Sequence, residues 1–183
     1  MATINIHSAA ELPVWRRPVA LLVLMAIAMP LAFATWSALL NNFVIERAAF
    51  TGVEIGWLHT VREIPGFLSF AVVFILIVMR EQLLGILSLI TLGVASAVTA
   101  YFPTFGGMLF ITFIASIGFH YFETVNQSLQ LQWISKERAP QVLGWLVAVG
   151  SGASLLSYGA LVATWDLFEL SYNTVYLISG GAC

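Results

Sequence analysis

The chain has 183 residues, of which 60% are hydrophobic and only 9% are charged, and its formal net charge is −2. This composition is typical of an integral membrane protein and not of a soluble domain. The lack of a basic excess argues against nucleic acid as a partner, because such binding neutralises phosphates with lysine and arginine. One cysteine, Cys183, and three scattered histidines give no disulfide and no metal-ligand spacing, so we expect no cofactor.

Five apolar segments are long enough to cross about 30 Å of hydrocarbon as helices. They cover about 18–40, 54–79, 83–101, 106–130 and 141–165, and residues 1–17 form a cytoplasmic N-terminal segment before them. A sixth apolar segment, about 171–183, is too short to cross, so we expect the sequence to stop inside a sixth span. The sequence predicts an all-α membrane bundle of about six helices over 18–183, with the sixth truncated. No internal repeat is obvious by eye.

The N-terminus has a second interpretation. Arg16 and Arg17, the apolar run from Val19 and then Ala32-Phe33-Ala34 resemble a secretory signal peptide with its cleavage site. The apolar run continues through Leu40, however, and this length favours an uncleaved first span.

The basic residues predict the orientation of the bundle, because cytoplasmic loops carry the excess of lysine and arginine. An inside N-terminus leaves only Arg47 in an outer loop. The cytoplasmic loops then hold Arg16, Arg17, Arg80, Lys136 and Arg138. We therefore expect a cytoplasmic N-terminus and a plasma-membrane location, of the bacterial inner-membrane kind.

A polar stripe runs along the fourth span, where six residues recur at steps of three or four and so share one helix face. These are Thr112, Ser116, His120, Glu123, Gln127 and Gln130. Polar groups in hydrocarbon must be solvated or paired. Interhelical hydrogen bonds would account for one or two of them, whereas six in register favour a cavity wall. We expect Glu123 and His120 to bind substrate or protons, with Ser116, Asn126 and Gln127 as hydrogen-bonding lining.

Three further polar residues, His59, Arg62 and Glu63, share a face of the second span. Arg62 stays charged at any relevant pH and offers a planar fork to an anion. We expect Arg62 to pair with Glu123, or Glu63 with His120, since pairing lowers the cost of burial. A gating or binding pair and a permanent structural ion pair are both consistent with Arg62 and Glu63.

The fifth span carries Gly144, Ala148 and Gly152 at four-residue spacing. Small residues at this period let helix backbones approach closely, so we expect a packing face. No nucleophile elbow, phosphate-binding loop or triad motif is present, and we expect no enzyme.

The span order, the short loops and the stretch from Glu123 through Lys136 and Arg138 to Gly144 resemble the N-terminal half of a major facilitator superfamily transporter. The resemblance covers nearly the whole chain. It implies that the first and fourth helices line a substrate cavity, the second and fifth pack against another half, and the third and sixth lie outside. Arg80 matches only part of the family's loop between spans two and three, where it would take part in gating.

The resemblance implies a secondary active transporter that moves a small solute by alternating access, with proton coupling as one option. Its partners would be the lipid bilayer and either a missing C-terminal half or a second copy. The fifth span lacks the Gly-Pro pair of drug antiporters, which leaves the substrate open. The alternative is a non-transporting assembly or receptor-like membrane protein whose buried polar residues are structural.

Overall fold

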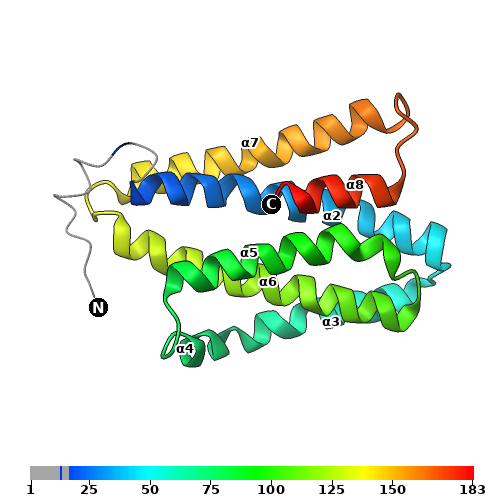
Figure 1. Ribbon diagram of the computed structural model, residues 1–183, viewed down its shortest axis with the longest axis horizontal. Helices are drawn as coiled ribbons and strands as arrows, with labels where there is room; N and C mark the ends of the chain where they lie inside the picture. The colour runs from blue at the N-terminus through cyan, green and yellow to red at the C-terminus, as the bar shows by residue number, and fades with distance from the viewer. Residues whose placement is uncertain (1–12, 14–16) are drawn as a thin grey trace.

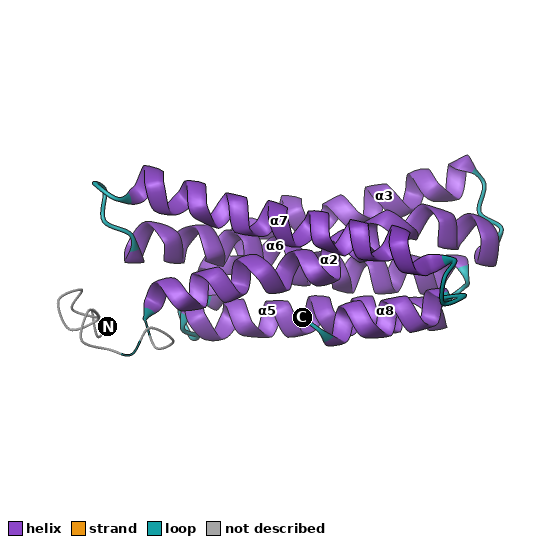
Figure 2. Ribbon diagram, turned by 90° about the horizontal axis from the view of Figure 1, so that it is seen from above, coloured by secondary structure: helices purple, strands orange, loops and turns teal. Residues whose placement is uncertain are grey.

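The structure is a computed structural model that describes Pro13 and residues 17–183, so most of the expected N-terminal segment lies outside the described residues. Every regular element in this part of the chain is a helix (Figures 1 and 2). Five stretches are long and apolar enough to cross a membrane, which confirms the all-α membrane bundle. The elements are α2 (Pro18–Ala48), α3 (Gly52–Phe67), η2 (Leu68–Ala71), α4 (Val72–Ile75), α5 (Glu81–Val98), η3 (Thr99–Tyr101), α6 (Phe105–Trp133), α7 (Ala139–Trp165) and α8 (Tyr172–Gly181).

The first span is longer than expected, because α2 continues to Ala48 and not to about residue 40. Asn41 and Asn42 are exposed, whereas Phe43 and Val44 that follow them are buried in the core. The asparagines therefore mark a polar helix face and not a loop. The helix also runs unbroken through residues 32–34, which resemble a cleavage site.

The second span is interrupted where a continuous helix was expected to residue 79. Pro65 has no N–H to donate, and Gly66 is a poor helix former. Ser69 Oγ donates a hydrogen bond to the Gly66 carbonyl at 2.7 Å. The helix tightens into the 3₁₀ turn η2, resumes for one turn as α4 and ends at Ile75. A 3₁₀ stretch within a span is often a hinge.

α2 and α6 lie at the centre of the bundle, with α3 packed on α6 and α7 packed on α2 (Figure 1). The two outer helices contribute little to the core: only Leu58 and Pro65 of α3 are buried, and only Leu146 and Ala153 of α7. α5 packs on α6 and α8, and buried Trp36 of α2 donates a hydrogen bond to Thr99 Oγ1 at 3.0 Å.

The helix contacts follow an internal twofold pattern. The contact of α2 with α7 corresponds to the contact of α6 with α3. In the same way, the contact of α2 with α8 corresponds to the contact of α6 with α5. The equivalent helices also meet each other, α2 with α6 and α5 with α8. α2 additionally contacts α5, whereas α6 has no comparable contact with α8, which has only 10 residues. The helices α2, α3–α4 and α5 thus form one unit, and α6, α7 and α8 form its counterpart.

Buried positions repeat between the two units at an offset of 86 to 88 residues. The motif Gly56-Trp57-Leu58 of α3 recurs as 144–146 in α7, and its leucine is buried both times. Phe33 of α2 stacks on Phe119 of α6, with ring centroids 4.1 Å apart. Every buried residue of α8 follows a buried residue of α5 by 87 positions: Tyr172, Val175, Tyr176, Ser179 and Gly180 follow Gly85, Ser88, Leu89, Leu92 and Gly93.

Each helix of the second unit is the third span after its counterpart, so the two units would cross a membrane in opposite senses and form an inverted repeat.

Candidate functional site

A cavity of about 230 Å³ lies between α2, α3 and α6, and we call it the central cavity. Arg62 stands ten residues after the start of α3, about 15 Å along the helix axis at 1.5 Å per residue, so the cavity is near the middle of the span. Aromatic and charged side chains share its wall. The lining residues are Phe33 and Ser37 of α2, Arg62 and Glu63 of α3, and Phe119 and His120 of α6.

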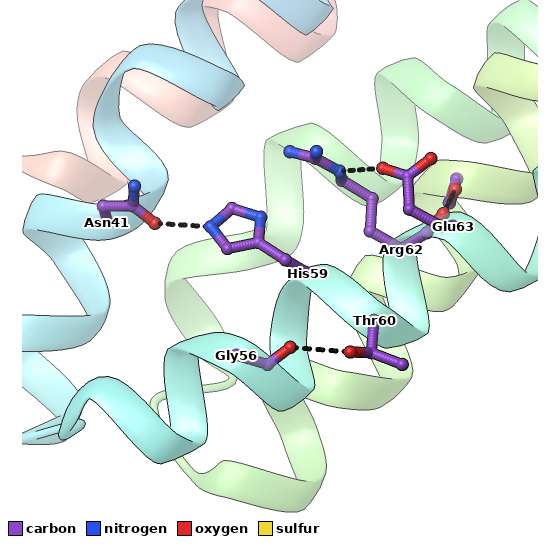
Figure 3. A network of polar contacts seen from close by, with 7 residues as sticks. Asn41, Gly56, His59, Thr60, Arg62 and Glu63 are labelled. Carbon is purple, nitrogen blue, oxygen red and sulfur yellow. Dashed lines mark hydrogen bonds and ion pairs between the residues drawn. The ribbon is translucent and has the colours of Figure 1, made fainter.

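Arg62 and Glu63 form an ion pair within α3, with Arg62 Nε 3.0 Å from Glu63 Oε1 (Figure 3). The expected pairs between helices, Arg62 with Glu123 and Glu63 with His120, do not form among the described residues. That expectation was wrong. Residues that are adjacent in sequence can pair through their side-chain rotamers alone, whereas a pair between two helices also requires the helices to lie close together at that depth. The bond uses Nε and Oε1, so Nη1 and Nη2 of Arg62 and Oε2 of Glu63 make no hydrogen bond within the described chain.

His59 binds across to the first helix and not into the central cavity. Its Nε2 lies 3.2 Å from Asn41 Oδ1, and this contact joins the middle of α3 to the last third of α2 (Figure 3). His59 thus supports the position of α3 one turn before Arg62.

The first half of the polar stripe packs against α3. Thr112 and Ser116 are buried, and Ser116 Oγ donates a hydrogen bond to the Arg62 carbonyl oxygen. The ring of His120 lies over Gly66, where an added Cβ would be 2.7 to 3.0 Å from the ring atoms. Here the stripe makes interhelical contacts, and Ser116 therefore has a structural partner.

The second half of the stripe opens away from α3. Glu123 is half-buried, Gln127 is exposed, and neither lines the central cavity. Asn126 Oδ1 is buried without a hydrogen-bond partner in the described residues. The roles expected for Glu123, Asn126 and Gln127 in binding or proton transfer stay predictions.

The remaining candidates lie apart from the central cavity. Arg80 is exposed at the residue before α5. Added Cβ atoms at Gly144 and Gly152 would meet nothing within 4 Å, and Ala148 is exposed, so no neighbour in the described chain uses this face of α7. Their packing role stays a prediction for a partner outside this chain.

Sequence reasoning missed the aromatic part of the site. The sequence did not predict that Phe33, Ser37 and Phe119 line the cavity. Only Phe119 could have been found, because it is adjacent to the candidate residue His120. The sequence also did not predict that Gly66 makes room for the imidazole of His120, because the two residues are 54 positions apart in the chain.

No family model, no curated protein and no solved structure matches the chain. The function is therefore inferred from the geometry of the described residues.

Gly66→Ala is expected to reduce solute transport by about 10-fold, because the new methyl displaces the His120 ring from the cavity wall. The fold should survive, since a ring can swing to another rotamer and alanine favours the helix by up to about 1 kcal/mol. Gly56→Ala is the matched control: it lies on the same helix and its Cβ would meet nothing within 4 Å. Uptake and thermal unfolding of both variants check this, and equal uptake would remove His120 from the site.

Proposed function

We propose that this chain is half of a secondary active transporter that moves a small solute across the plasma membrane by alternating access. The inverted repeat is the observation that carries this proposal. In transporters of this architecture the solute site lies near the bilayer midplane, between the repeats. The central cavity has that position, since its Phe33 and Phe119 are the contact between equivalent helices α2 and α6.

The proposed partner is a second six-helix half, either a further part of the same protein or a second copy of this one. Rocking one half against the other is how such transporters expose a midplane site to each side in turn. α3 and α7 are the helices with the fewest buried residues, and under the resemblance they would face the partner half. The N-terminus would lie in the cytoplasm of a bacterial cell, as the basic loops indicate.

Proton coupling would use His120 and Glu123. His120 lines the cavity, and half-buried Glu123 lies three residues further along the same stripe, within one helical turn. A proton could therefore move between the cavity and the open half of the stripe along α6.

The experiment that tests this role is uptake by the full-length protein with Glu123→Gln. We expect solute accumulation driven by a proton gradient to fall at least 10-fold, while the protein stays folded in the membrane. Leu131→Ala, at an 80% exposed position of the same helix, is the control for perturbing α6. Normal gradient-driven uptake by Glu123→Gln would overturn the coupling role of this carboxyl group.

One observation favours the structural alternative, a membrane assembly that moves no solute. Three polar contacts satisfy side chains locally: Arg62 with Glu63, Ser116 with the Arg62 carbonyl, and His59 with Asn41. Such contacts hold helices together in any bundle. Under this alternative, Arg62→Ala would chiefly reduce the folded yield, and no solute would be taken up.

A further inference from the structure

We propose that the central cavity binds a zwitterion with an apolar side group, of which a neutral hydrophobic α-amino acid is the simplest example. This inference rests on the proposed function, because it names the solute class of the same cavity.

The first argument is charge balance. The cavity wall contains one fixed cation, Arg62, and one carboxylate, Glu63. A solute with a net charge would leave one charge in the cavity without a partner of opposite sign. A zwitterion has no net charge and can offer each wall group a partner of opposite sign.

The second argument is the geometry of the ion pair. Its single bond joins Nε to Oε1, which leaves the Nη1–Nη2 edge of the guanidinium and Oε2 of Glu63 available (Figure 3). The free edge has the donor spacing that a carboxylate accepts in a bidentate manner. The free carboxylate oxygen accepts from an ammonium group. The pair therefore offers one donor edge and one acceptor on neighbouring side chains.

The third argument is the apolar side of the cavity. Phe33 and Phe119 stack with ring centroids 4.1 Å apart, and both line the cavity together with the charged pair. The cavity of about 230 Å³ has room for the side group of a small solute. An apolar side group against the two rings would be removed from water while the charged end reaches α3.

The test measures binding, separately from transport. The full-length protein in detergent is titrated with L-leucine, with 4-methylpentanoate, which lacks the amine, and with isoamylamine, which lacks the carboxylate. Isothermal titration calorimetry measures Kd, and L-phenylalanine is tested as a second zwitterion. We expect at least one of the amino acids to bind, and each analogue to bind at least 10-fold more weakly.

Variants assign the binding to the cavity. Arg62→Gln and Glu63→Gln should each raise the Kd of the amino acid about 10-fold or more, since each removes a charged partner. Glu81→Gln is the control, because Glu81 bonds Ser128 and Gln132 away from the cavity. Equal affinity for an analogue, or no amino-acid binding, would overturn the zwitterion proposal. Transport of a solute of another class would also overturn the zwitterion proposal, but it would support the proposed function. Amino-acid binding without any transport would contradict only the proposed function.

Discussion

Gly118→Val is expected to prevent the bundle from packing. Gly118 lies where α6 crosses α5, and an added Cβ would be 2.6 Å from Leu92 N and 2.7 Å from Ser88 O. These are backbone atoms, so no rotamer change can relieve the clash and the two helices must separate. Such overpacking costs about 1–3 kcal/mol where side chains can yield. Because backbone blocks this site, we expect a loss of about 3 kcal/mol or more in the free energy of unfolding.

Denaturation in sodium dodecyl sulfate and the folded yield after purification measure this effect. Gly106→Val, at the start of the same helix, is the control, because a Cβ there would meet nothing within 4 Å. If Gly118→Val unfolded at the same denaturant fraction as the parent protein, the close crossing of α5 and α6 would be wrong.

Arg62→Gln is expected to reduce solute transport about 100-fold and to change the free energy of unfolding by less than about 1 kcal/mol. The small stability effect follows from exposure. The side chains of Arg62 and Glu63 are 28% and 62% exposed, and exposed ion pairs contribute about 0–1 kcal/mol. The large transport effect follows from the place of the guanidinium on the cavity wall, where it would bind the solute.

This variant separates the two candidate functions, since a structural pair and a binding pair predict opposite patterns. Arg138→Gln is the control, as it removes an exposed arginine from the residue before α7. Uptake and denaturation are measured on all three proteins. A large fall in stability that accounts for the lost uptake would favour the structural alternative over the transporter.

Helix positions were the most predictable part of this molecule. The limits of α6 and α7 fall within three residues of the expected 106–130 and 141–165, because apolar runs bounded by turn residues determine a span. The end of α2 was predicted too early, because Asn41 and Asn42 indicated a loop. In the structure both lie on the exposed face of a helix that continues to Ala48. The break after Gly66 was missed because apolar residues continue through the 3₁₀ turn.

The candidate site was only half predictable. The polar stripe identified His120, and the charged residues of the second span identified Arg62 and Glu63, all of which line the central cavity. Which partner Arg62 takes depends on helix separation, and a single sequence does not specify that distance. The repeat was not obvious by eye, because few equivalent positions carry the same residue. These are the three-residue motif beginning at Gly56 and again at Gly144, Phe33 with Phe119, and Gly93 with Gly180, whereas other positions share only burial.

Alternating access requires the central cavity to open to each side of the membrane in turn. Ser37 lines this cavity, so the variant Ser37→Cys is made in full-length protein in which Cys183 is replaced by serine. A membrane-impermeant maleimide is applied to right-side-out and to inside-out vesicles. The proposed mechanism predicts labelling from both sides, with a transported solute slowing it. Labelling from one side only, unchanged by any solute or gradient, would contradict alternating access.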